Sequence, residues 1–241
     1  MKNRDNNRTS VVLVHGAFAD ASSWQKVIPL LEKEGLAVTA VQLSLKSLAE
    51  DVATTKRLID SQPGDVILVG HSYGGAVITE AGAGNQKVKG LVYVAAFAPG
   101  AGEDLDGLIE RFSPSALGTA VVPDSAGFLF IDRAKFQSVF ANDLPKEEAS
   151  LLAATQKPLA ASIFGEPIKA AAWRNIPSWY VVSTQDNSIN PELQRFMAKR
   201  MGAKIKEIKA SHVSFISNPS EIAKVIETAA ALVGGQKAKH I

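Results

Sequence analysis

The chain has 241 residues, of which 46% are hydrophobic and 21% are charged, so it has the composition of an ordinary globular protein and enough length for one large core. A net charge of +2, without Lys/Arg clusters interleaved with aromatic residues, gives no support for binding to nucleic acid. The absence of cysteine excludes disulfides, thiolate metal sites and a cysteine nucleophile.

The N-terminal segment, Met1 to Ser10, is polar and lacks the apolar core of a secretion signal. No apolar run approaches the length of a membrane span, so we expect no membrane partner. The default expectation is a cytoplasmic protein, although a leader removed before residue 1 would leave the same sequence. Residues 236–241 are expected to form a frayed tail.

The first 98 residues alternate between predicted strands and helices. Apolar, mostly β-branched runs predict strands over residues 9–15, 37–42, 66–69 and 91–97. Helices are predicted over residues 24–34, 45–61 and 74–83. Ser22 or Ser23 is expected to cap the first helix, which Pro29 should kink or shorten. This order is typical of a parallel sheet with right-handed crossovers.

The segment 99–173 breaks the alternation, because its apolar clusters are interspersed with proline, glycine and acidic residues. We interpret it as a cap inserted into a core made of residues 9–98 and 174–235. Strands are again predicted over 179–183 and 204–208, and helices over 191–201 and 220–233. The predicted fold is therefore α/β, with a mainly parallel sheet of six strands flanked by helices.

The third predicted strand ends in Gly70-His71-Ser72-Tyr73-Gly74. In a Gly-x-Ser-x-Gly turn the serine has strained backbone geometry, and its flanking positions are small because neighbouring backbone passes close by. The helix that follows points its N-terminal amides toward the serine, where negative charge develops during acyl transfer. The pattern arises by chance in about one chain in ten of this length, so the strand before it and the helix after it add specificity.

His15-Gly16-Ala17-Phe18 follows the first predicted strand. An oxyanion hole needs one amide from the residue after the nucleophile and a second from a loop after an early strand. We predict Tyr73 and Ala17 as these two donors, and Phe18 as a substrate-binding residue. The alternative reading of this motif is an ordinary strand-to-helix turn.

Three side chains lie just past the carboxyl ends of predicted parallel strands, namely Ser72, Asp186 and His212. Loops at that edge of an α/β sheet converge, so residues far apart in the sequence can meet there. His212 is expected to take the proton of the Ser72 hydroxyl, and Asp186 is expected to hold the imidazole in the right tautomer.

Other residues compete for these roles. His15 and His71 belong to the two oxyanion loops and are expected to serve packing or loop hydrogen bonds, while His240 lies in the tail. Glu103 and Asp104, which follow the fourth strand, are alternatives to Asp186 as the acid. The four histidines show no metal-ligand spacing, so no metal site is predicted.

Together, five motifs resemble the α/β-hydrolase superfamily, and in particular the compact branch of plant methyl esterases and hydroxynitrile lyases. They are residues 13–17, 70–75, 94–99, 184–186 and 211–212. The similarity spans residues 11–233 and is weakest in the cap. It implies a six-stranded core, a Ser-His-Asp triad without cofactor and an acyl-enzyme intermediate. Lyases of this branch have a threonine where this chain has Gly16 and a lysine where it has Val213, so cyanohydrin cleavage is disfavoured.

We therefore expect a serine hydrolase of a small, largely apolar carboxylic ester or lactone. The alternatives are a C–C bond hydrolase or lyase on the same scaffold, and a ligand receptor with a vestigial triad. The expected partner is the small-molecule ester, and the oligomeric state stays open between a monomer and a homodimer.

Overall fold

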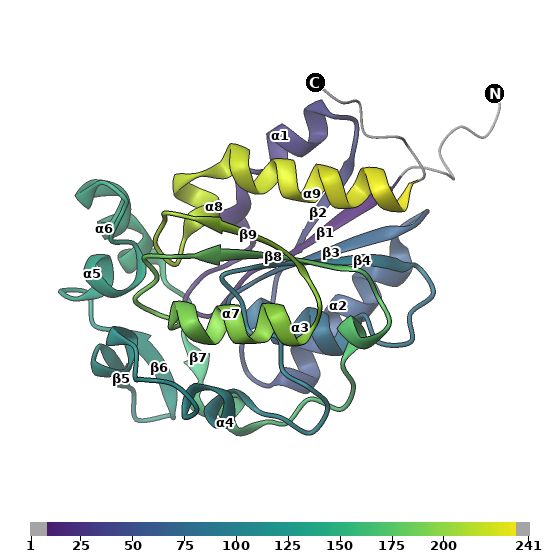
Figure 1. Cartoon of the computed structure of the whole chain (residues 1–241). Helices are drawn as coiled ribbons and strands as arrows, with labels where there is room; N and C mark the ends of the chain where they lie inside the picture. The colour runs from purple at the N-terminus through teal and green to yellow at the C-terminus, as the bar shows by residue number, and fades with distance from the viewer. Residues whose placement is uncertain (1–8, 235–241) are drawn as a thin grey trace.

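A six-stranded sheet, in which each neighbouring pair of strands is parallel, forms the centre of the computed structural model (Figure 1). The structure describes residues 9–234, so His240 and the expected tail lie outside it. Across the sheet the strands are β2 (Ala37–Val41), β1 (Ser10–Val14), β3 (Val66–His71), β4 (Val88–Val94), β8 (Ser178–Ser183) and β9 (Lys204–Ile208). The predicted parallel α/β fold is confirmed.

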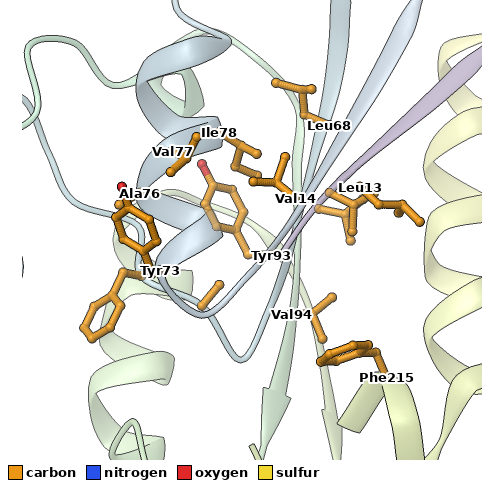
Figure 2. Close-up of a cluster of buried hydrophobic side chains, with 14 of the residues drawn as sticks. Leu13, Val14, Leu68, Tyr73, Ala76, Val77, Ile78, Tyr93, Val94 and Phe215 are labelled. Carbon is orange, nitrogen blue, oxygen red and sulfur yellow. The ribbon is translucent and has the colours of Figure 1, made fainter. Parts of the chain in front are cut away.

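Helices cover both faces of this sheet (Figure 1). One face carries α1 (Ile28–Lys33) and α9 (Pro219–Val233), and the other carries α2 (Leu48–Ser61), α3 (Tyr73–Ala81) and α7 (Pro191–Arg200). Every residue of β1, β3 and β8 is buried, because these strands are covered on both sides. Figure 2 shows Leu68 of β3 and Tyr93 of β4 beside Val77 and Ile78 of α3.

The first helix starts later than predicted. A 3-10 turn, η1 (Ala21–Trp24), comes first, and the carboxylate of Asp20 caps it by accepting from the amide of Ser22, so the expected serine cap was wrong. Helix α1 begins only at Ile28, with Pro29 in its first turn. Proline is tolerated there because amides of the first turn have no acceptor within the helix.

The segment between β4 and β8 contains α4 (Leu105–Ile109), α5 (Phe136–Phe140) and α6 (Lys146–Thr155). A small antiparallel sheet accompanies them, made of β5 (Val121–Pro123), β6 (Phe128–Ile131) and β7 (Leu159–Ala160). The 3-10 turns η2 (Ala116–Thr119), η3 (Ala161–Gly165) and η4 (Ala172–Arg174) complete the segment. It lies beyond the carboxyl ends of the core strands (Figure 1).

Backbone and side-chain hydrogen bonds attach this segment to the core. The amide of Ala160 donates to the carbonyl of Leu45 at 2.9 Å, and the carboxylate of Glu166 accepts from the amide of Leu48 at 2.9 Å. No helix within residues 9–234 combines the length and hydropathy that crossing a membrane requires.

Candidate active site

Ser72 lies in the sharp turn between β3 and α3, with φ 52° and ψ −124°. This strained, left-handed backbone is found where the surrounding structure enforces it, commonly at active sites. The enforcement is visible at the glycines: a Cβ on Gly70 would lie 2.6 Å from the carbonyl oxygen of Gly74, and one on Gly74 would lie 2.5 Å from that of Val14. Only glycine therefore lets the turn pack this closely against β1.

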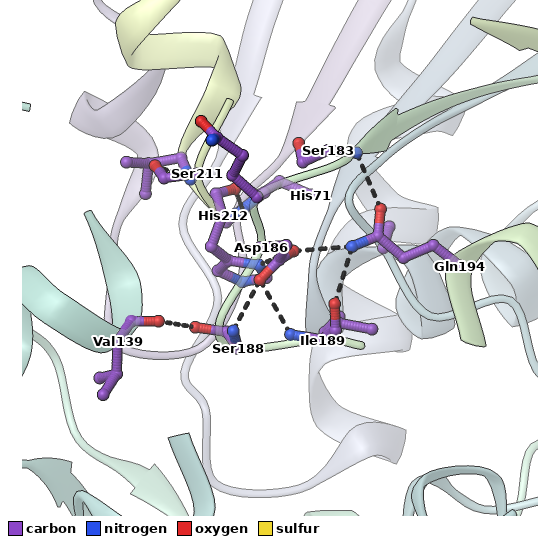
Figure 3. Close-up of polar contacts among 12 residues, drawn as sticks. His71, Val139, Ser183, Asp186, Ser188, Ile189, Gln194, Ser211 and His212 are labelled. Atoms are coloured by element: carbon purple, nitrogen blue, oxygen red, sulfur yellow. Dashed lines mark hydrogen bonds and ion pairs between the residues drawn. The ribbon is translucent and has the colours of Figure 1, made fainter. Parts of the chain in front are cut away.

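His212 and Asp186 form a buried hydrogen-bonded pair, with 2.8 Å between Nδ1 of the ring and Oδ2 of the carboxylate (Figure 3). Oδ1 of Asp186 accepts from the amides of Ser188 at 2.7 Å and Ile189 at 2.9 Å. The carboxylate can only accept, so Nδ1 of the neutral ring carries the proton and Nε2 is left as the acceptor. This is the tautomer that a general base needs.

A cavity of about 160 Å³ brings Ser72 and His212 together with Ala17, Phe18 and Tyr73. Most of its other lining side chains are apolar, among them Leu105, Ile109, Phe164 and Ile189. In the described chain the Ser72 hydroxyl makes no hydrogen bond with the His212 ring. Hydrogen bonds between a nucleophile and its base are often long in ligand-free enzymes and shorten when substrate binds.

Ala17 and Tyr73, whose amides are the predicted oxyanion donors, both line this cavity. Neither amide donates a hydrogen bond within residues 9–234. Tyr73 is the first residue of α3, and the first amides of a helix have no intrahelical acceptor. Both donors are thus available to a ligand.

His15 and His71 are bonded to backbone. Nδ1 of His15 lies 2.8 Å from the carbonyl of Gly16, and its Nε2 accepts from the amide of Leu43 at 3.1 Å. Nε2 of His71 lies 2.9 Å from the carbonyl of His212. Burial lowers the pKa of His15 to about 4 and holds the pKa of His71 well below its ordinary value, so both rings are neutral and fix loop geometry.

Aromatic rings form a continuous row through the site. Trp24 packs on Phe215 at 4.4 Å between centroids, Phe215 on His71 at 4.5 Å, and His71 on His212 at 4.6 Å. The row continues from His212 to Phe140 at 4.9 Å and from Phe140 to Phe18 at 6.3 Å. The imidazole of His212 is therefore held between rings as well as by Asp186.

The alternative acids are engaged elsewhere. Oε1 of Glu103 pairs with Arg200 at 2.8 Å and with Arg111 at 3.0 Å. The carboxylate of Asp104 caps α4 by accepting from the amide of Gly107 at 2.7 Å. The structure thus places Asp186 against His212 and bonds both alternatives to other groups. Histidine and acidic side chains in the described part of the chain form no group of three or more that could hold a metal ion.

Sequence reasoning missed Gln194, whose Nε2 donates to Oδ2 of Asp186 at 2.8 Å (Figure 3). A glutamine on a helix is usually read as a solvent-facing residue. The signal that would have revealed it is its place in the apolar stripe of α7, with Leu193, Met197 and Ala198.

Comparison with known proteins agrees with this geometry. The profile of the alpha/beta hydrolase family matches residues 11–225. Pyrethroid hydrolase of Sphingobium wenxiniae is 29% identical, over 90% of this chain and 86% of that protein. Polyneuridine aldehyde esterase of Rauvolfia serpentina is 27% identical, over 89% of this chain and 93% of that protein.

Among solved structures, a pyrethroid hydrolase from Sphingobium faniae has the same fold, with a TM-score of 0.81. It is 24% identical, and the match covers 92% of this chain and 97% of that one. The family profile spans most of the chain, and the fold and the resemblance drawn from the sequence motifs agree with it. The chain therefore belongs to the alpha/beta hydrolase family.

Proposed function

We propose that this protein is a serine hydrolase that cleaves a small, largely apolar carboxylic ester or lactone through an acyl-enzyme intermediate. The observation that carries the proposal is the shared cavity: Ser72 in its strained turn, His212 bonded to Asp186, and the unused amides of Ala17 and Tyr73 all meet there. Relatives that include a pyrethroid hydrolase and an esterase support an ester as the substrate.

In the proposed reaction the Ser72 hydroxyl attacks the carbonyl carbon while Nε2 of His212 takes its proton. The amides of Ala17 and Tyr73 stabilise the oxyanion, and the bond to the leaving alkoxide breaks as His212 returns the proton to it. Water then attacks the acyl-enzyme, with His212 again as the base. The bond from the acyl group to Ser72 breaks as His212 returns the proton to the Ser72 oxygen. The products are a carboxylic acid and an alcohol from an ester, or one hydroxy acid from a lactone, and water is the other reactant.

The size and lining of the cavity support a small substrate. Its volume of about 160 Å³ is well below the roughly 300–1,000 Å³ of pockets for drug-sized ligands. Phe18 and Phe140 line both this cavity and a second one of about 330 Å³. We assign Phe18 to the wall between the two, where its ring would contact the bound ester.

The lyase alternative gains no support from the loop after β1. A Cβ on Gly16 would lie 2.7 Å from Cβ of Ser72 and 3.1 Å from the carbonyl oxygen of His71, so a threonine there would require the backbone to move. Val213, which is buried, offers no charge at the position of the lyase lysine.

The proposal is tested by labelling the protein with a small fluorophosphonate and measuring turnover of p-nitrophenyl acetate. We expect the label on Ser72. Ser72→Ala should abolish labelling and lower kcat by about 10⁴-fold or more. The matched control is Ser115→Ala, because Ser115 lines the same cavity but caps its turn without a side-chain hydrogen bond.

Equal turnover by Ser72→Ala and the wild-type protein would refute the mechanism. Labelling of Ser72 without steady-state release of product would favour a receptor. Faster turnover of a cyanohydrin or a vinylogous diketone than of any ester in a panel would favour lyase or C–C hydrolase activity.

A further inference from the structure

Gln194 is a fully buried polar side chain on a helix whose other buried residues are mostly apolar. Its relative exposure is 0%. Burying an amide costs free energy unless its donors and acceptor are satisfied.

Its amide makes three hydrogen bonds (Figure 3). Oε1 accepts from the amide of Ser183 at 3.0 Å, while Nε2 donates to the carbonyl of Ile189 at 2.9 Å and to Oδ2 of Asp186 at 2.8 Å. The opposite orientation of the amide would set a donor against the Ser183 amide and an oxygen against two oxygens. The network therefore permits one orientation only.

These bonds join the end of β8 to the loop that carries Asp186. The two oxygens of Asp186 are held differently: Oδ1 is fixed by the amides of Ser188 and Ile189, whereas Oδ2 is bonded to Gln194 and His212. Without Gln194, His212 would be the remaining hydrogen-bond partner of Oδ2 in the described chain.

We propose that Gln194 is a positioning residue that holds Oδ2 of Asp186 against Nδ1 of His212 by bracing residues 183–189. The inference rests on the proposed function, because it assigns Gln194 a role toward the acid of the triad. It adds a side chain from α7 to Asp186 and the neighbouring rings, on which the orientation of His212 depends.

Titratable groups near the Gln194 side chain come from the loop after β8, from β8 itself and from β9. Asp186 and, beyond it, His212 face the Gln194 amide from the loop side. From β8, the buried hydroxyl of Tyr180 bonds to the backbone of Ala96, and burial raises the pKa of Tyr180 far above its ordinary value, so it stays neutral. From β9, Glu207 pairs with Arg195 of α7 at the surface.

Gln194→Glu tests the proposal because it keeps the size of the side chain, removes the donor to the Ile189 carbonyl at every pH and makes the bond to Asp186 depend on pH. Two carboxylates in one buried site share a proton, so the pKa of the pair is raised. While the introduced carboxyl is protonated, it can donate a hydrogen bond to Asp186. Once it is ionised, the two carboxylates repel each other. We expect kcat/KM for p-nitrophenyl acetate to fall at least about tenfold above roughly pH 7, where the wild-type protein keeps its plateau.

Gln194→Met keeps the volume but removes all three hydrogen bonds. We expect kcat to fall by about 10²-fold with little change in KM, since a misplaced base affects the chemical step more than binding. The matched control is Met197→Ala, one turn along the same buried face. It should lower stability while keeping the wild-type pH profile.

A wild-type pH profile for Gln194→Glu, with Gln194→Met behaving like Met197→Ala, would overturn the proposal. A second readout does not depend on turnover: the low-field proton resonance of His212 Nδ1 should shift or broaden in Gln194→Met and stay unchanged in Met197→Ala. If the wild-type protein neither hydrolyses esters nor is labelled at Ser72, the proposed function fails, while the resonance still decides the role of Gln194.

Discussion

At the scale of single residues, Asp186 receives four hydrogen bonds while being almost completely buried. Both of its oxygens face donors only. An amide in its place would set its NH₂ group against donors in either orientation, and it would favour the wrong tautomer of the His212 ring.

We therefore expect Asp186→Asn to lower kcat for p-nitrophenyl acetate by about 10⁴-fold, the loss found when the acid of a Ser-His-Asp triad is replaced in this way. Glu103→Gln should leave kcat unchanged, because Glu103 is paired with Arg200 and Arg111. Loss of activity in Glu103→Gln, with activity kept in Asp186→Asn, would move the role of the acid to Glu103.

The sequence was informative about residues whose position follows from topology. Ser72, Asp186 and His212 could be placed near one another because each follows a strand of one parallel sheet. Gln194 could not be assigned a role, because the contact of one amide with one carboxylate depends on the packing of α7 against β8. The sequence favoured Asp186 over Glu103 as the partner of His212 but could not show the contact. That contact depends on the three-dimensional positions of the loops.

At the scale of elements, the turn between β3 and α3 is packed against the backbone at the carboxyl end of β1 and against the backbone of Phe97, which follows β4. A Cβ on Gly75 would lie 2.2 Å from the carbonyl oxygen of Phe97, and one on Gly74 would lie 2.6 Å from that of His15. The obstacles are backbone atoms, which cannot rotate away as a flexible side chain can.

Gly74→Ala is expected to destabilise the protein by about 1–3 kcal/mol through this overpacking and to slow labelling of Ser72. Gly165→Ala is the control, since its nearest neighbour is an oxygen of Asp106 at 4.0 Å, and we expect a change within about 0.5 kcal/mol. Urea unfolding gives both free energies of unfolding, and equal values for the two variants would contradict close packing at Gly74.

The strands were largely predictable from the sequence where helices cover both faces of the sheet. Continuous apolar runs such as 66–69 mark central strands because both faces of the sheet are covered. The small antiparallel sheet was not predicted, since its strands have two to four residues and lie among proline and glycine. The start of α1 was missed because a proline is as well suited to a first turn as it is disruptive in a helix interior.

At the scale of the whole molecule, buried neutral histidines make stability depend on pH. Burial lowers the pKa of His15 to about 4, whereas its pKa in the unfolded chain is about 6.5. Between these values the unfolded chain binds the proton more readily, so the free energy of unfolding falls as the pH is lowered through this window. Above pH 6.5 the ring is neutral in both states and adds no pH dependence.

We expect His15 to contribute a loss on the order of 3 kcal/mol between about pH 6.5 and pH 4. Urea unfolding of the wild-type protein and of His15→Gln, in steps of one pH unit, isolates this term. The other buried groups with shifted pKa values, His71 and the carboxyl of Asp51, whose pKa is raised by burial, are present in both proteins. The variant should be less stable near neutral pH, and the difference should shrink toward pH 4. A difference independent of pH would contradict the assignment.

The row of rings that runs from Trp24 to Phe18 connects the fluorescence of Trp24 to the site. The indole packs on Phe215, Phe215 packs on His71 and His71 packs on His212, so a charge appearing on the His212 imidazole lies three aromatic contacts away. Emission of Trp24 should therefore respond to a change of charge on His212, and it can be read without a dye in a variant in which the other two tryptophans, Trp173 and Trp179, are replaced by phenylalanine.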